Sequence, residues 1–264
     1  GIINYMITGW LIFLLAGIVT GIVTGLVGAS AIVIFVPIIL LFFDYSLFVL
    51  IGMSLAVDVF VALFAWIVYR KFKHIDFKTG FYLSILAIFG AVFGSYFSRF
   101  IPNTGLLEAI SIFTAITGIM IFRRKVNKKE VCTSNDCPRS KFILAIILSF
   151  FVGLLGGGLG PAGGISIFLL LVFFLNFETH RAIGTSVFVM FFIALFGSVA
   201  HIYYISSSNF PWILLLFAVV GGIFGSFFSS RFANAIAEKN LNRIVGAILF
   251  VLGVLTLVQK LIMN

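Results

Sequence analysis

GLVGAS at residues 25–30 and GLLGGGLGPAGG at residues 153–164 place clusters of glycine inside two long apolar segments. Glycine lacks a Cβ atom, so it supplies the permissive backbone that a break in a helix requires. An IG-x-S box and then a box of small residues follow each cluster in the same order. These boxes are IGMS (51–54) and GAVFGSYFSRF (90–100) in the first half, and IGTS (183–186) and GGIFGSFFSSRF (221–232) in the second.

This ordered duplication predicts two repeats, at residues 1–124 and 141–264, with a basic cytoplasmic loop at residues 125–140 between them. Membrane units that are duplicated and broken at matching positions are typical of transporters whose binding site lies between the halves.

Composition identifies lipid as the solvent of this chain. Of its 264 residues, 62% are hydrophobic and 9% are charged, so a water-soluble fold would expose long apolar runs. The runs are continuously apolar and lack the two-residue alternation of a membrane β-barrel. We therefore expect an all-α polytopic membrane protein whose first residues form an uncleaved membrane segment.

The charges and cysteines indicate neither a nucleic-acid partner nor a cofactor. The net charge is +9, but the basic residues lie in short loops at membrane boundaries, which fits contact with anionic lipid head groups. Cys132 and Cys137 lie in the central loop, where we expect reduced thiols if that loop is cytosolic. Two cysteines alone are too few for a structural zinc site, so we expect no metal.

Hydropathy predicts six plain membrane spans of about 20 residues each. They cover residues 46–69, 79–98, 105–122, 182–204, 210–230 and 243–262. The glycine-containing segments, 8–42 and 141–175, are too long for one straight span. Their glycine clusters leave flanks of only about 12–17 residues, which is short of a full crossing. Each segment is therefore either one broken helix that crosses or a re-entrant hairpin of two half-helices.

Loop charge favours the hairpins. If the broken segments cross, the halves share one orientation, and 12 of the 17 basic residues lie inside. If they are hairpins, the halves are inverted and 15 of the 17 lie inside, with only Arg99 and Lys260 outside. The stronger asymmetry agrees better with the positive-inside rule, so we predict inverted repeats, each with a re-entrant hairpin and three transmembrane helices.

The two breaks predict an anion site. Helical breaks within a membrane persist only where protein buries them or where they line a wet cavity. A half-helix that begins at such a break presents free N–H groups and a partial positive charge, and two such ends aimed at the midplane would bind an anion. No Lys or Arg lies deep in a predicted span, so amides and hydroxyls would have to hold it. The candidate substrate-binding residues are Gly25, Gly28, Ala29, Ser30, Ser54, Gly156, Gly157, Gly158, Gly160, Pro161, Gly163, Thr185 and Ser186.

Other glycines have a simpler interpretation. Gly90 and Gly94, like Gly221 and Gly225, are spaced four residues apart, which is typical of closely packed membrane helices. For these four we favour packing over binding.

Two ionisable side chains are candidates for proton or ion coupling. Asp58 lies four residues after Ser54, on the same helical face and deep in a predicted span. A carboxyl at that depth is either functional or a neutral, hydrogen-bonded structural group. His201 lies near the outer end of its span, where it is either an interfacial side chain or a proton relay.

Together these motifs resemble the sulfite exporter TauE/SafE family of prokaryotic membrane transporters. The resemblance covers essentially the whole chain and rests on GIVTGLVG (21–28) and GLLGGGLG (153–160), on both pairs of boxes and on the basic central loop. It implies secondary transport, by an exporter, of sulfite, sulfonates or related small anions across the cytoplasmic membrane. The halves differ where PAGG (161–164) stands opposite ASAI (29–32). The two glycine breaks, which would form the tips of the hairpins, therefore need not contribute equally to anion binding.

Three alternatives share parts of this evidence. A passive anion channel would have the same architecture but no dependence on a proton gradient. An intramembrane serine protease would need Ser30 as nucleophile and His201 as base, within about 3 Å or one water. A non-transporting scaffold would pack its glycine tips dry, without donors.

Overall fold

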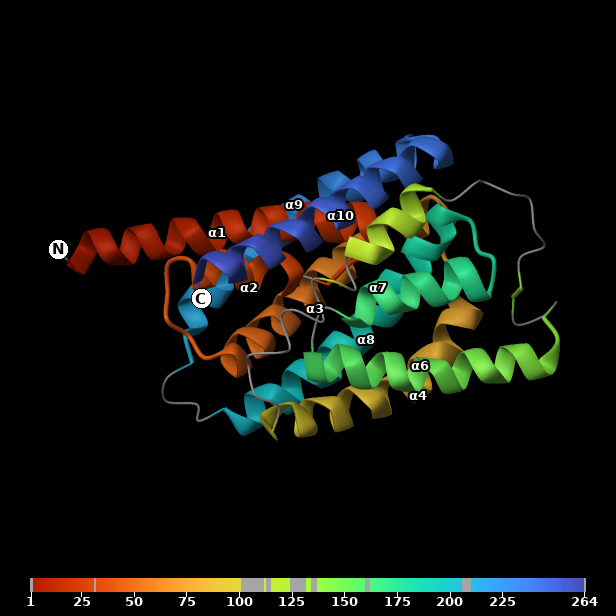
Figure 1. Ribbon diagram of the computed structural model, residues 1–264, viewed down its shortest axis with the longest axis horizontal. Helices are drawn as coiled ribbons and strands as arrows, with labels where there is room; N and C mark the ends of the chain where they lie inside the picture. Colours follow the sequence, from red (N-terminus) through yellow and green to blue (C-terminus); the bar gives the residue numbers. More distant parts are fainter. Residues whose placement is uncertain are drawn as a thin grey trace.

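In the computed structural model of this chain, residues 2–30, 32–100, 112, 115–123, 132–133, 137–159, 162–205 and 210–263 are described. All regular structure among them is helical (Figure 1). The elements are α1 (Ile2–Val27), α2 (Ile32–Leu40), α3 (Leu47–Lys71), α4 (Phe77–Phe97), the 3-10 turn η1 (Ser98–Phe100), α6 (Arg139–Leu159), α7 (Ala162–Leu169), the π-helical turn η2 (Leu170–Phe174), α8 (Thr179–Tyr204), α9 (Trp212–Ala235) and α10 (Glu238–Met263).

Six helices in the described part of the chain are long and apolar enough to cross a membrane. They are Thr8–Val27, Leu47–Lys71, Phe77–Phe97, Arg139–Gly158, Thr179–Tyr204 and Trp212–Ala235. The predicted all-α polytopic membrane fold is thus confirmed. Of the predicted span at 105–122, residues 105–111 and 113–114 lie outside the described residues, and 115–122 are helical.

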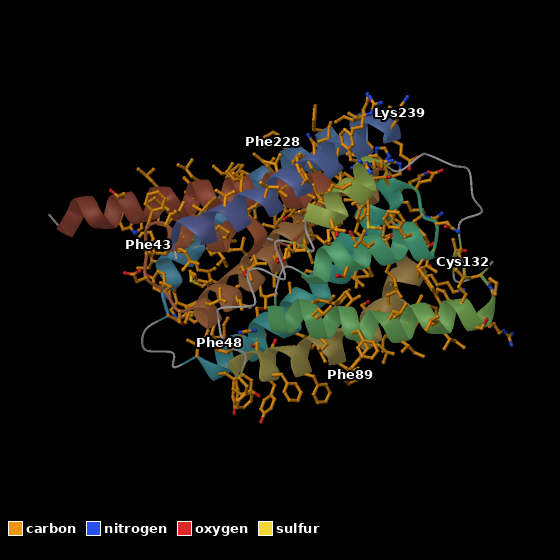
Figure 2. All side chains as sticks on the ribbon, viewed as in Figure 1. Phe43, Phe48, Phe89, Cys132, Phe228 and Lys239 are labelled. Carbon is orange, nitrogen blue, oxygen red and sulfur yellow. A yellow bond between two sulfur atoms is a disulfide. The ribbon has the colours of Figure 1, made fainter. Side chains whose placement is uncertain are left out.

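Large apolar side chains project from the outside of the bundle. Phe89 on α4 is 57% exposed and Phe228 on α9 is 65% exposed, and both point away from the neighbouring helices (Figure 2). Such an apolar outer surface requires lipid rather than water around it.

Each glycine-containing segment folds as a long helix followed by a short one. The expected flanks of 12–17 residues were wrong, because α1 has 26 residues and α6 has 21. Glycines 17, 21 and 25 continue α1 without a break, since each faces the backbone or hydroxyls of α9 instead of forming a turn.

The short helices turn back along the long ones. In α1, the ring of Phe13 lies 5.7 Å from that of Phe35 in α2, although 22 residues separate them. In the second half, Lys141 Nζ at the start of α6 lies 5.5 Å from the ring of Phe174, at the end of η2. Re-entry of α2 and α7 into the bilayer, and the inverted orientation of the halves, stay predictions.

Small residues set the closest helix contacts. A Cβ atom added to Gly90 would lie 2.1 Å from Phe150 O, and one added to Gly221 would lie 2.3 Å from Leu14 O. Gly94 and Gly225 repeat these contacts one turn further on. The predicted packing role of these four glycines is confirmed, and it joins α4 to α6 and α1 to α9 (Figure 1).

The central loop holds a disulfide instead of the expected free thiols. Cys132 and Cys137 are bonded, and their Cα atoms lie 4.6 Å apart. The backbone N–H of Cys132 also donates to Leu175 O at 2.9 Å, which attaches the loop to the end of η2. Residues 125–131 and 134–136 of the predicted loop lie outside the described residues.

Candidate functional site

The two glycine breaks contact each other. A Cβ atom placed on Gly164, in the first turn of α7, would lie 2.6 Å from Gly28 O and 3.1 Å from Ser30 N. It would also lie 2.7 Å from the sulfur of Met190, a residue halfway along α8. No side chain fits at position 164, so the backbones of the two tips meet directly.

Gly28 forms the turn in the first half. Its φ of 71° lies in the left-handed region that residues other than glycine rarely adopt. Its N–H makes the last bond of α1, to Thr24 O at 2.8 Å, after which the chain leaves the helix. A Cβ atom here would lie 2.6 Å from Ser186 Oγ, so α8 closes directly over the turn.

Ser30 and Asp58 form a buried polar pair at the start of α2. Ser30 Oγ donates a hydrogen bond to Asp58 Oδ2, and the two residues are only 2% and 1% exposed. Asp58 lies halfway along α3, and Ser30 lies two residues before α2 begins at Ile32. The carboxyl group is therefore bonded to a residue that lies just before the N-terminus of α2.

The remaining predicted residues of the first half have structural partners. Ala29 is fully buried between Gly28 and Ser30. Ser54 Oγ donates to Ile51 O in its own helix at 2.8 Å. Gly25 packs on α9, where a Cβ atom would lie 2.1 Å from Ser229 Oγ.

In the second half, the glycine cluster chiefly packs helices. Gly156 and Gly163 close the α6–α7 hairpin, since a Cβ atom on Gly156 would lie 2.8 Å from Gly163 Cα. Gly157 and Gly158 face the backbone of α4, with a Cβ atom on Gly157 only 2.0 Å from Ala91 O. Gly160 and Pro161 lie outside the described residues.

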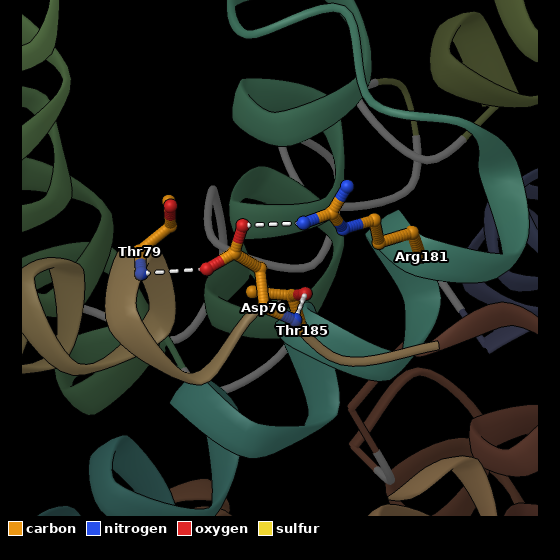
Figure 3. A network of polar contacts seen from close by, with 4 residues as sticks. All are labelled: Asp76, Thr79, Arg181 and Thr185. Atoms are coloured by element: carbon orange, nitrogen blue, oxygen red, sulfur yellow. Dashed lines mark hydrogen bonds and ion pairs between the residues drawn. The ribbon is translucent and has the colours of Figure 1, made fainter. Parts of the chain in front are cut away.

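Two adjacent residues of the IG-x-S box in the second half contact different parts of the structure. Ser186 lies at the tip beside Gly28, and its hydroxyl donates to Ile183 O at 2.9 Å. Thr185 points the other way, where its Oγ1 accepts a hydrogen bond from Asp76 N at 3.0 Å (Figure 3). Thr185, on α8, therefore contacts the α3–α4 connection, whereas its neighbour Ser186 contacts Gly28.

His201 lies apart from Ser30. Its Nε2 pairs with Gly157 O at 2.9 Å, and its ring packs 4.5 Å from that of Phe48. Its Nδ1 has no hydrogen-bond partner among the described residues. Because Ser30 donates to Asp58, the structure does not form the Ser30–His201 dyad that a serine protease would need.

Several polar residues near the first tip had not been predicted. Tyr69, fully buried, donates to Gly25 O at 2.9 Å. Thr20, Thr24 and Ser230 are buried, and their hydroxyls have no hydrogen-bond partner within the described structure. Their side chains are ordinary in membrane helices, so only tertiary structure distinguishes them.

Sequence comparison agrees with this architecture. The family described as Sulfite exporter TauE/SafE matches residues 13–256. This chain belongs to that family of membrane transporters. It is 25% identical to the "Probable membrane transporter protein YunE" of Bacillus subtilis, over 92% of this chain and 96% of the relative. The "Probable membrane transporter protein YdhB" of the same organism is 27% identical over 79% and 84%, respectively. No solved structure matches the chain.

Proposed function

We propose that this TauE/SafE family protein is a secondary transporter that exports small sulfur-containing or organic anions, such as sulfite or sulfonates. It would act in the cytoplasmic membrane of a prokaryote by alternating access. The observation that supports this most is the contact between the tips. Gly28, Ser30 and Gly164 come together beside the midpoints of α3 and α8, where two half-helices begin.

The chemistry of this region favours an anion held by neutral groups. No Lys or Arg occurs in residues 1–69 or 142–180, which contain both glycine breaks. The starts of α2 and α7 supply N–H groups with partial positive charge. The buried hydroxyls of Thr20, Thr24 and Ser230 are further donors in this part of the fold.

Asp58 couples anion binding to a proton in this mechanism. An ionised carboxylate and a bound anion about 4 Å apart would repel by about 4 kcal/mol at an effective dielectric constant of about 20. Anion binding therefore favours protonated Asp58, and Ser30 holds that carboxyl group at the start of α2. Anion and proton would then bind together and leave together.

A flux screen in proteoliposomes tests this proposal. Sulfite, sulfate, thiosulfate, sulfoacetate and acetate are each offered with and without a pH gradient. We expect one small anion to accumulate beyond its electrochemical equilibrium when a proton gradient is present. Flux that never exceeds equilibrium would identify a passive channel, and the absence of flux and binding for all anions would refute the anion site.

Substitution of Asp58 tests whether this residue couples proton binding to anion transport. Asp58→Asn should bind the anion with little dependence on pH and should lose proton-driven accumulation. Ser198→Ala is the control. Ser198 is buried, as Asp58 is, but it lies in α8 and donates to Leu195 O within its own helix, so its loss should leave proton-driven accumulation unchanged. An Asp58→Asn protein with the pH dependence of the wild type would remove Asp58 from the mechanism.

A further inference from the structure

We propose that Asp76 and Arg181 form a latch between the two halves, which closes the anion site at the end where α3 meets α4. This inference rests on the proposed transport function. It states that the ion pair must separate whenever the tips become accessible from that end. Charge asymmetry predicts this end to be the cytoplasmic one.

The latch joins residues from both halves. Asp76 lies in the α3–α4 connection of the first half, and Arg181 lies in the first turn of α8 in the second. Arg181 Nη2 donates to Asp76 Oδ2 at 2.7 Å, and Asp76 N donates to Thr185 Oγ1 at 3.0 Å (Figure 3). Among the described residues, this is the one salt bridge.

Asp76 is held rigidly for this contact. Its second carboxylate oxygen, Oδ1, accepts from Thr79 N at 3.0 Å and caps the start of α4. The Asp76 carboxylate therefore bonds to α4 through Oδ1 and to Arg181 of the second half through Oδ2. The guanidinium of Arg181 also lies 5.3 Å above the ring of Phe177, which limits its freedom.

His74 completes the closure over the same end. A Cβ atom on Gly184 would lie only 2.1 Å from His74 O, so the connection rests directly on the backbone of α8. His74 Nδ1 pairs with Asn234 Oδ1 of α9 at 2.5 Å. Residues 74–76 thus contact two helices of the second half.

The latch and the first glycine tip contact adjacent residues of α8. Thr185 contacts Asp76, whereas its neighbour Ser186 contacts Gly28. Tyr69, in the last turn of α3, reaches Gly25 O from the same end. A solute that approaches Gly28 from this end must therefore displace the α3–α4 connection from α8.

Labelling of a buried thiol tests the latch without any substrate. The probe is Ser186→Cys in a protein that carries Cys132→Ser and Cys137→Ser. Ser186 is fully buried in the closed structure. A membrane-impermeant maleimide is added to one side of the membrane at a time. Asp76→Asn and Arg181→Ala are the latch variants, and Asp76→Asn keeps an oxygen that can cap α4.

We expect each latch variant to raise the labelling rate from the α3–α4 side on the order of tenfold, because a charge-assisted contact is lost. Labelling from the other side should not rise. Arg231→Ala is the control, since Arg231 lies over the ring of Phe227 on α9, and should leave labelling unchanged.

Unchanged labelling in both latch variants, or an equal rise from both sides, would overturn the latch. A failure of the anion flux screen would instead refute the proposed function. The labelling experiment contains no transported anion, so its result does not depend on that screen. The two inferences can therefore fail separately.

Discussion

The contact between α1 and α9 predicts a strong position effect for a single methyl group. Gly21 faces the backbone of α9, where an added Cβ atom would lie 2.1 Å from Gly222 O and 2.7 Å from Ser226 N. Gly9 lies in the same helix, but a Cβ atom there would meet only side chains, at 3.5 Å from Leu214 and Phe43. Gly21→Ala and Gly9→Ala are therefore the same chemical change in two different surroundings.

The magnitude follows from the missing space. Ordinary contacts begin near 3.4 Å, so Gly21→Ala must separate α1 from α9 by more than 1 Å. Overpacking of this kind costs about 1–3 kcal/mol, and a backbone neighbour cannot rotate away to reduce it. Both substitutions share the gain of about 1 kcal/mol in helix propensity, which cancels in the comparison.

The assay is thermal unfolding of the purified proteins in one detergent. We expect Gly21→Ala to melt about 5–10 °C below Gly9→Ala, from a difference of about 2–3 kcal/mol. Equal melting temperatures for the two variants would show that the α1–α9 contact is looser than described, and the argument from small residues would fail.

Other predictions concern single contacts. Tyr69→Phe removes the bond to Gly25 O and should lower stability by about 0.5–1.5 kcal/mol in a melting experiment; Tyr82→Phe, at a side chain that is 39% exposed, should have no effect. Gly157→Leu should lower the yield of folded protein, since even a Cβ atom there lies 2.0 Å from Ala91 O; a stable, monodisperse Gly157→Leu protein would contradict this packing. Alkylation followed by mass spectrometry should find Cys132 and Cys137 blocked until a reductant is added, and free thiols before reduction would contradict the disulfide.

The fold was largely predictable because lipid imposes one rule along the whole chain. A span must be apolar and helical, so hydropathy alone places α3 (Leu47–Lys71) close to its predicted range of 46–69. The four-residue spacing of Gly90 and Gly94 likewise predicted a tight helix contact, because one helical face must be free of side chains for backbones to approach.

The candidate site was predictable only in part. The sequence shows which residues are small or polar, but the face that each one presents depends on how helices cross. Thr185 and Ser186 are adjacent, yet one contacts Asp76 and the other contacts Gly28. Gly157 resembled a tip residue because it lies in a glycine cluster, although it packs on α4. The bond from Tyr69 to Gly25 O spans 44 residues, and no local pattern marks it.

The two tips differ in one respect that bears on mechanism. Halfway along α3, Asp58 contacts Ser30 at the first tip, whereas halfway along α8 the thioether of Met190 lies against Gly164 at the second. The first half-helix therefore begins beside a group that can carry a negative charge, and the second begins beside a neutral one. In the proposed mechanism, an anion would be attracted to the starts of both α2 and α7 but would be repelled only at the first, and only while Asp58 is ionised. It follows that the second tip should supply the larger share of anion affinity at high pH, and that lowering the pH should strengthen binding through the first.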